Sequence, residues 1–485
     1  MALNTGHTHQ TEEDIISMLI DDVLISVLGK VDMKSAMRAS VLSTRWRHLP
    51  WLLTQLSIDI KDFLREPYND PTVDDHVNKA MSSLTEAVRS MLTPTRRKSV
   101  IKRLCISLFL INSYSMEIGR LVNEAIEKGI VQNIELTSGV ERFAFDVSHE
   151  EMLKHADGVN SFFRHYPNIS CHLTSLRLYN ATFSASDMHN LLDNTCTQLQ
   201  YLYLYQCDTG FATIFKIDAQ NSKLKVLEFA HCACQRVELV CLPKLELLIS
   251  GYWSSPYLPL TLGNVPCLKE VEVYSPTESY QEPFKLSELL SGTTCINTLT
   301  LDFLGQKIWL QPEKNQLHSS FTNLMEMSLH GIFVGFGLLW TIVLLEAAPS
   351  LDIFDVEVHD HICLDEEERI ETYGERTNAY ATFASESAHS AKPLPLKELV
   401  LRGFNATEQH IEFIGAVMER ASNLKSVVLK KQYCKKCSAI SVPTTSGGCK
   451  FPKNEDEKEA VVNNLRSRFS SRAQIIFDDF KIFSD

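Results

Sequence analysis

The side chains with the clearest potential for chemistry are three cysteines near the C-terminal end. Cys434 and Cys437 have the two-residue spacing of a zinc-binding pair, and Cys449 follows twelve residues later. A structural zinc ion needs four ligands, but no histidine follows His410 and no cysteine follows Cys449. The sequence therefore predicts no metal site and no cofactor.

Two other clusters carry reactive groups without the partners that catalysis needs. His359, Asp360 and His361 are consecutive but lack the spaced carboxylate of a known motif, and Cys232 and Cys234 are separated by one residue. The phosphate-binding, nucleophile-elbow and HExxH zinc-protease motifs do not occur. We therefore expect a protein that is not an enzyme.

The composition limits both the architecture and the class of partner. The chain has 485 residues, 44% of them hydrophobic, which is more than one compact core of about 250–300 residues holds. Its 47 basic and 60 acidic residues give a net charge of −13, which argues against general binding to nucleic acid or membranes. The polar N-terminal residues lack the form of a secretory signal, so we expect reduced cysteines and a location in the cytoplasm, the nucleus or both.

A short repeated frame predicts the fold. The frame reads apolar, two variable, apolar, one variable, apolar, and it recurs at intervals of 21 to 28 residues with one gap of 45. Its alternation predicts a β-strand with one buried face, and a unit this short must stack on neighbours to bury that face. The pattern resembles leucine-rich repeats; the alternative is an ordinary α/β domain with leucine-rich strands. The ten frames begin at Leu173, Leu199, Leu224, Leu245, Leu268, Ile296, Leu324, Leu351, Leu396 and Leu424.

Looser frames and connecting helices extend this pattern. Ile101 and Val140 begin two weaker frames. Apolar residues three and four positions apart predict helices near 187–196 and 408–421, the second with Thr407 as its N-cap. The uncharged run 331–345 is too short for a membrane span of about 20 residues and predicts a buried helix. We interpret the 45-residue gap before Leu396 as an insertion loop.

The N-terminal part differs from the repeats and predicts a small helical module. Residues 20–31 and 32–43 can each form a short amphipathic helix, and residues 44–53 add two tryptophans. A module of under fifty residues buries little apolar surface by itself. We therefore expect a partner to complete its core.

Two segments point to a known family. The stretch DIISMLIDDVLISVLGKVDMKSAMRASVLSTRWRHL resembles the F-box of plant F-box proteins with leucine-rich repeats, and residues 395–431 resemble the FBD segment of the same proteins. The resemblance implies an α/β chain with a helical F-box at 12–58, an irregular leucine-rich-repeat solenoid at 96–394, and an FBD segment and cap at 395–485. In the solenoid we expect parallel strands on the concave face and helices or loops on the convex face.

The N-terminal segment departs from the family pattern at four positions. Ile20 stands where the family has the proline of a Leu-Pro pair, and Asp32 replaces a second proline. Ser35 replaces an aspartate, and Trp51 is displaced by one position. In proteins of that family, the segment that contains these positions contacts the adaptor.

The resemblance implies a non-catalytic substrate receptor of a ubiquitin ligase. In the family, the F-box docks on a Skp-type adaptor held by a cullin–RING scaffold, and the repeats bind a protein substrate. One alternative is a repeat protein that no longer engages the ligase; another is that Val27, Leu42 and Trp46 only fill the module's core. The residues that the resemblance places against the adaptor are Leu19, Ile20, Val23, Leu24, Leu28, Val41, Leu42 and Trp46.

The outward strand positions predict the substrate surface. In each frame the third and fifth side chains point away from the core. Aromatic and acidic residues at these positions suit a basic or mixed protein surface, although polar residues there also serve solubility alone. We expect Tyr179, Tyr205 and Tyr274 just beyond their strands. The predicted substrate-facing residues are Arg177, Tyr201, Tyr203, Glu228, Glu270, Glu272, Glu326 and Asp355.

Overall fold

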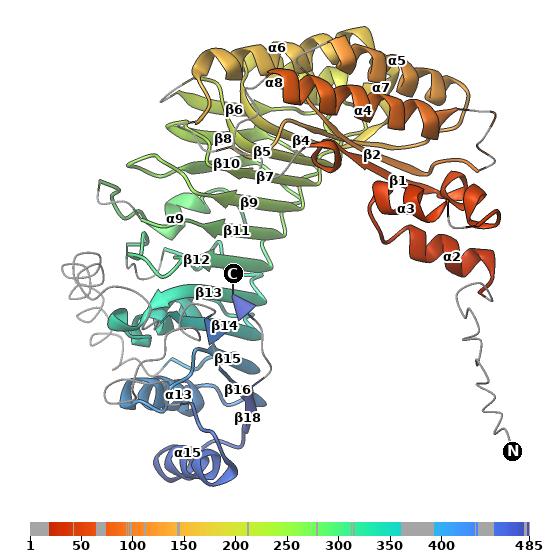
Figure 1. The fold of residues 1–485 in the computed structure, drawn as a ribbon. Helices are drawn as coiled ribbons and strands as arrows, with labels where there is room; N and C mark the ends of the chain where they lie inside the picture. The colour runs from red at the N-terminus through yellow and green to blue at the C-terminus, as the bar shows by residue number, and fades with distance from the viewer. Residues whose placement is uncertain are drawn as a thin grey trace, which may run out of the picture. The chain divides into compact units, whose positions relative to one another are not determined.

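The computed structural model describes most of the chain (Figure 1). The chain forms two compact units. The first unit comprises Met1–Gly139 and Asp157–Leu176, and the second comprises Val140–Ala156 and Arg177–Asp485. The residues that the structure describes are 19–41, 43–64, 74–93, 95, 97, 99–110, 113–142, 146–210, 213–277, 280–311, 313, 316–359, 392–431, 433–434, 451–479 and 483–484.

The first unit combines short helices with parallel strands. Its strands are paired in the order β1-β2-β3, all parallel. Helix α4 contacts both α5 and β1, so the amphipathic helices cover the strands (Figure 1). The elements are α2 (Asp21–Leu28), α3 (Met33–Ala39), η1 (Trp46–Leu52), β1 (Gln55–Asp59), η2 (Ile60–Phe63), α4 (Asp74–Leu92), β2 (Arg103–Leu108), α5 (Ser113–Glu127), β3 (Ile134–Ser138) and α7 (Pro167–His172), and α6 (His149–His165) crosses the boundary.

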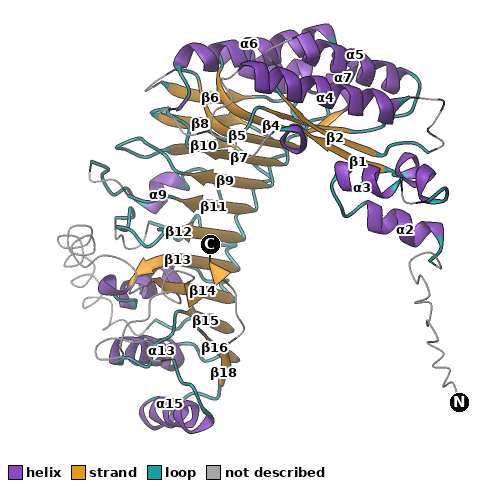
Figure 2. Cartoon of the chain, in the orientation of Figure 1, coloured by secondary structure: helices purple, strands orange, loops and turns teal. Residues whose placement is uncertain are grey.

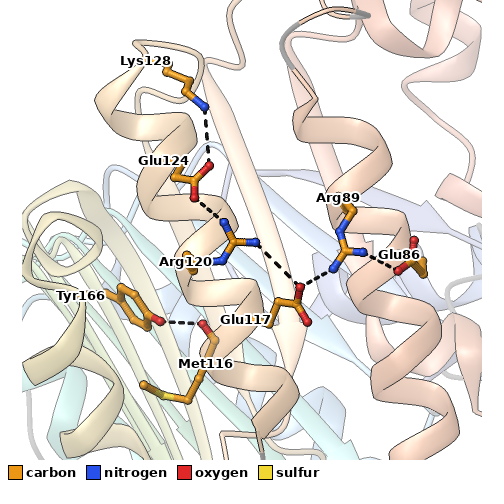
Figure 3. A network of polar contacts seen from close by, with 8 residues as sticks. All are labelled: Glu86, Arg89, Met116, Glu117, Arg120, Glu124, Lys128 and Tyr166. Carbon is orange, nitrogen blue, oxygen red and sulfur yellow. Dashed lines mark hydrogen bonds and ion pairs between the residues drawn. The ribbon is translucent and has the colours of Figure 1, made fainter.

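Polar contacts fix how α5 lies against its neighbours (Figure 3). Arg89 of α4 forms an ion pair with Glu117 of α5, and the Tyr166 hydroxyl donates a hydrogen bond to the Met116 carbonyl oxygen at 2.6 Å. The Tyr166 ring reaches α5 because position 119 is glycine, where a Cβ would lie 2.3 Å from the ring. The charged pairs are exposed, so each contributes about 0–1 kcal/mol and mainly sets register. The charged network comprises Glu86, Arg89, Glu117, Arg120, Glu124 and Lys128.

The second unit is dominated by a ladder of parallel strands (Figure 2). The hydrogen-bonded order is β4-β5-β7-β9-β11-β12-β13-β14-β15-β16-β18. All ten predicted frames lie on these strands, and the fourth and sixth positions face the core, as Leu202 and Leu204 do with 0% exposure. The strands are β4 (Leu173–Thr182), β5 (Tyr201–Asp208), β7 (Val226–Ala230), β9 (Leu247–Gly251), β11 (Glu270–Tyr274), β12 (Thr298–Asp302), β13 (Glu326–Phe333), β14 (Ile353–His359), β15 (Glu398–Arg402), β16 (Ser426–Lys430) and β18 (Gln474–Asp478).

The connections between these strands differ in part from the prediction. Three of them contain short strands, which form a second parallel sheet in the order β10-β8-β6, so helices and loops alone do not return the chain. These strands alternate buried and exposed residues, as in β6, and so pack one face inward. The additional strands are β6 (Ile214–Asp218), β8 (Arg236–Cys241), β10 (Leu260–Asn264), β17 (Tyr433–Cys434) and β19 (Phe483–Ser484).

The helical predictions are confirmed in two places and wrong in one. Thr407 caps α13 by accepting a hydrogen bond from the His410 N–H, and a helix also forms after residue 184. The predicted helix over 331–345 is instead the end of β13 followed by three short helical segments. Most of its residues are buried, which accounts for the apolar composition, although Gly335 is exposed. The helices are α8 (Ala185–Asn190), η4 (Leu191–Thr195), α9 (Leu286–Leu289), η5 (Val334–Phe336), η6 (Leu339–Thr341), α10 (Ile342–Ala347), α13 (Glu408–Arg420) and α15 (Glu455–Arg468).

The weaker frames had mixed outcomes. The frame at Ile101 corresponds to β2, but the frame at Val140 is wrong, because residues 140–142 form no strand and 143–145 lie outside the described residues. The strand of that region is β3, which follows Val131 in the same frame. The predicted insertion loop falls largely on residues 360–391, which lie outside the described part of the chain.

Candidate interaction surfaces

Helix α2 is apolar on two sides. Leu24 and Leu28, four residues apart, are 0% and 3% exposed and pack in one cluster with Leu49 of η1. On another side of the same helix, Val23 and Val27 are 41% and 47% exposed. A helix that has already buried one apolar face does not need a second for its own folding, so the exposed side chains form a candidate docking surface.

The structure separates the residues predicted to face the adaptor into two groups. Ile20, Val23 and Val41 are exposed, at 65%, 41% and 81%. Leu24 and Leu28 point inward instead, because their spacing places them on the helix face that packs against η1. The partly buried Leu19 and Trp46 pack against this same cluster, and Leu42 lies outside the described residues.

The interpretation of Val27 as a core residue is wrong, because its side chain is 47% exposed. Together with Ile20, Val23, Val31 and Val41, it accounts for five of the thirteen large hydrophobic side chains that are exposed among the described residues. Five such residues within 22 positions form a concentration that single surface hydrophobics elsewhere do not match. We call these five residues the apolar stripe.

Two of the positions that differ from the F-box pattern have local structural roles. Asp32 is the N-cap of α3, and its carboxylate accepts hydrogen bonds from the Ser35 N–H and hydroxyl, both at 2.7 Å. The side-chain hydrogen bond from Ser35 is the main reason that the Asp32 pKa is lowered. At α2, the Arg45 guanidinium contacts the Asp21 carboxylate at 2.7 Å and the Leu19 carbonyl oxygen. Side-chain caps and ion pairs thus replace the rigidity that prolines would supply.

On the sheet of the second unit, an aromatic and acidic cluster begins at β4 and β5. The Arg177 guanidinium lies over the Tyr201 and Tyr203 rings, 4.7 and 5.4 Å from their centroids. The Tyr201 hydroxyl donates a hydrogen bond to the Glu228 carboxylate at 2.7 Å. Burial raises the pKa of both tyrosines above the ordinary range, so their hydroxyls stay protonated donors. Four predicted substrate-facing residues are therefore brought together.

Rings continue from this cluster across five strands. Tyr179 lies 5.6 Å from both Tyr203 and Tyr205, centroid to centroid. Tyr179, Tyr205 and Tyr274 lie within β4, β5 and β11 rather than beyond them, because these strands extend past the frame. We name the continuous set the tyrosine band; it comprises Tyr179, Tyr203, Tyr205, His231, Tyr252 and Tyr274.

Two members of the tyrosine band were not predicted. His231 and Tyr252 each occupy the eighth frame position, just after β7 and β9, with φ of 55° and 51°. This left-handed conformation is costly for a residue with a Cβ, and the two rings stack at 4.2 Å between centroids. The signal available in the sequence was an aromatic residue at the same position of two successive frames.

Small side chains make room for the rings. Ala230 and Gly251 occupy the row between Tyr205 and Tyr274 in the parallel register. A Cβ at position 251 would lie 2.3 Å from the Tyr274 ring, so the ring rests directly on the glycine backbone. The absence of a side chain at position 251 lets the Tyr274 ring approach the Tyr252 ring, with 5.4 Å between their centroids.

We expect Gly251→Ala to displace the Tyr274 ring and to break the tyrosine band at β11. The added methyl group conflicts with the ring, and the cost of about 1–3 kcal/mol is typical of overpacking. Tyrosine fluorescence and thermal unfolding measure the change. Gly129→Ala is a poor control because its φ is positive; Ala230→Gly, in the same row, is the better one. An unchanged Tyr274 environment in Gly251→Ala would contradict this packing.

Four carboxylates on this face have no ion-pair partner among the described residues. Glu228, Glu270, Glu272 and Glu326 point outward at the third and fifth positions, and none forms an ion pair with another described residue. Burial, with added repulsion from Glu228 and Asp302, raises the pKa of Glu272. We call these four residues the open acids.

Asp355 behaves differently from the other predicted substrate-facing residues. It is 8% exposed, and its carboxylate accepts hydrogen bonds from the Arg402 Nε at 2.8 Å and Nη2 at 2.6 Å. His330 Nε2 lies 3.8 Å from the same carboxylate. The outward position is correct, but neighbouring strands cover the side chain with these cations, so Asp355 has a structural contact instead of a free face.

The described part of the chain holds neither a candidate metal site nor a candidate membrane span. Among the described residues, no three or more His, Cys, Asp or Glu side chains are grouped to hold a metal ion. Cys437, Cys449, Asp360 and His361 lie outside that part of the chain. None of the described helices combines the length and apolarity needed to cross a bilayer.

Comparison with known proteins supports the repeat architecture. No curated protein matches the chain. The family model described as At1g61320/AtMIF1, LRR domain, named for a plant protein, matches residues 125–464. That range contains all ten predicted frames and the full tyrosine band. The chain belongs to this plant leucine-rich-repeat family, whose domain has a role in protein interaction.

Proposed function

We propose that this protein is the substrate-recognition subunit of a Skp–cullin–F-box ubiquitin ligase. In this proposal, the N-terminal helices bind a Skp-type adaptor, and the outward face of the repeat sheet binds a protein substrate in the cytoplasm or nucleus. The chemistry belongs to other subunits, so this chain acts as a receptor. The residues after 394 act as the FBD segment, which closes the repeats with α13, α15, β16 and β18.

The observation that carries the proposal is the apolar stripe on a module with its own core. Leu24, Leu28 and Leu49 already form the interior of the module, so the exposed valines are surplus to its folding. Val23 and Val27 are four residues apart and so follow one side of α2, and Ile20 is the extended N-cap that precedes the helix. A second helical protein could bury Val23 and Val27 by packing along α2.

The adaptor proposal is tested by capture of the full-length chain on an immobilised, purified Skp-type adaptor. We expect Val23→Asp/Val27→Asp to reduce capture at least about tenfold, because two carboxylates would be desolvated at the interface. Leu153→Asp is the matched control, since Leu153 is 44% exposed on helix α6. Equal capture of the wild-type and double-variant chains would contradict the assignment of this surface.

A third variant separates the ligase proposal from the alternative of a repeat protein that has lost its adaptor. The Ile20 backbone has φ of −71°, which proline accepts, so Ile20→Pro restores the family residue without strain. Capture of Ile20→Pro but not of the wild-type chain would favour the alternative. Absence of capture for both would overturn the ligase proposal.

A further inference from the structure

We infer that the repeat face binds an extended, basic protein segment, laid across the tyrosine band from β4 to β11 with its cations over the open acids. The inference deepens the proposed function, because it names the chemistry of the substrate segment. It uses only contacts within the second unit and needs no adaptor.

Charge is paired unevenly along the outward face of the sheet. Toward its C-terminal end, Asp355 contacts Arg402 at 2.6 Å and Asp478 contacts Lys430 at 3.4 Å, while Glu398 of β15 accepts a hydrogen bond from the Ser426 hydroxyl at 2.9 Å. At β7 to β13, none of the four open acids forms an ion pair with a described residue. A bound cation would complete the pairing of these acids.

The acids lie in the row next to the rings. Parallel register places Tyr203, Glu228, Ile249 and Glu272 on one row across β5, β7, β9 and β11. The next row, two residues along, runs from Tyr205 to Tyr274, and it faces the same side of the sheet. A segment that crosses the strands therefore meets rings and carboxylates side by side.

Like charges are crowded on this face of the sheet. Glu272 has a raised pKa because it is partly buried and faces Glu228 and Asp302, although His330 opposes this effect. The pKa of Asp302 is also raised, mainly by burial. A lysine or arginine placed between these groups would relieve the repulsion, which a neutral or acidic ligand would not do.

The dimensions of the band set the length of the segment. The strands β4, β5, β7, β9 and β11 are neighbours, and at about 4.8 Å per strand they span about 19 Å. An extended chain covers this distance in about six residues. Arg177 lies at the β4 end, so the basic residues of the segment belong at the β7–β11 end, near Glu228, Glu270 and Glu272. Aromatic or aliphatic residues suit the β4 end.

Aromatic rings beside the carboxylates are expected to bind the cations of the segment more tightly than carboxylates alone would. A guanidinium already lies over the Tyr201 and Tyr203 rings, which shows that this surface supports cation–π contact. Tyr205 and Tyr274 have pKa values raised to about 12, chiefly by burial, so they remain neutral rings at physiological pH. A bound cation would thus contact neutral aromatic rings and lie beside carboxylates.

The test measures fluorescence anisotropy of labelled peptides of about ten residues with the full-length chain. One peptide alternates lysine and alanine, the second replaces each lysine with glutamate, and the third replaces each lysine with glutamine. We expect only the lysine peptide to bind, and we expect its affinity to fall as the salt concentration rises. We expect Glu228→Gln/Glu272→Gln to weaken it about tenfold, with Glu412→Gln/Glu459→Gln as an exposed control of equal charge change.

The outcomes separate this inference from the ligase proposal. Glutamine keeps the acceptor that Tyr201 uses, so loss of binding in Glu228→Gln/Glu272→Gln reports charge and not misfolding. Equal binding by both double variants, or binding of the neutral peptide as tight as that of the lysine peptide, would overturn the inference. Adaptor capture on the same samples tests the ligase proposal alone, and either result can fail without the other.

Discussion

Replacement of Arg402 by methionine is expected to destabilise the repeats by about 2–3 kcal/mol. The substitution keeps the aliphatic stem but leaves the Asp355 carboxylate, 8% exposed, without its bidentate partner. Loss of one member of a buried ion pair costs about 3–5 kcal/mol. We take a smaller value because the Arg402 side chain is 32% exposed and His330 remains 3.8 Å away. Hydrogen exchange at the amides of β14 and β15 measures the loss as a local free energy of opening.

The double variant Asp355→Asn/Arg402→Met is the control for Arg402→Met. It removes both charges, so the stability is expected to return most of the way to that of the wild-type chain. If Arg402→Met alone were as stable as the wild type, the ion pair would have no net role. If the double variant were no better than the single one, lost packing would explain the effect.

The pH dependence of Arg402→Met follows from the two titrating groups. Burial opposes ionisation of Asp355, but His330 and Arg402 outweigh it and lower the pKa; the resulting stability is present above the unfolded pKa of about 3.9 and is lost as pH falls through the folded value. Burial also disfavours protonated His330, but Asp355 and Glu357 raise its pKa. Its contribution is complete below about 6.5 and is lost as pH rises. Without Arg402, His330 is the remaining cation, so the deficit is expected to be larger at about pH 8 than at about pH 6.

The second large effect is expected for Leu24→Ala in the N-terminal module. Leu24 is 0% exposed in a cluster whose other buried members are Leu28, Ala36, Leu49 and Leu53. Truncation of a buried leucine costs about 2–5 kcal/mol, and a cluster of five residues has little stability to lose. We expect α2 and α3 to lose hydrogen-exchange protection and adaptor capture to fall with them, while the repeat strands stay protected.

Val27→Ala is the matched control for Leu24→Ala. It removes methyl groups from the same helix at a side chain that is 47% exposed, so protection of α2 should change little. Equal protection of α2 in Leu24→Ala and in the wild-type chain would contradict the assignment of Leu24 to the core. A loss of protection that spread into β5 or β7 would contradict the independence of the module.

The strands of the repeat sheet were predictable because their signal is local. Each frame places leucine or its equivalents two and three residues apart, and this spacing alone decides which side chains are buried. Strand β1 obeys the same rule, with Leu56 and Ile58 at 1% and 0% exposure, but its frame lies at the end of the segment interpreted as helical. Strands β6, β8 and β10 were not predicted, since five or six residues of alternation within a connection resemble an ordinary loop.

The candidate surfaces were predictable only where a single strand or helix determines which side chains point outward. The outward positions of Tyr201, Tyr203 and Glu228 follow from strand alternation, and the structure brings the three side chains together. Asp355 does not remain open, because the cations that cover it come from strands elsewhere in the sequence. Leu24 and Leu28 resemble a docking surface in sequence, but which face of a short helix is buried depends on η1, which no helical periodicity reveals.

The ladder of parallel strands has a consequence for how the protein unfolds. Each strand from β5 to β16 bonds to its nearest neighbours in the repeat order, so coupling between distant repeats passes through every repeat that lies between them. Such chains behave as a linear array in which stability is a sum of local and nearest-neighbour terms. Loss of the Arg402 contact would therefore unfold the repeats around β15 before the others. The partly unfolded intermediates would give a denaturation curve that a single sigmoidal transition does not fit. Folding can begin at any adjacent pair of repeats and spread in both directions.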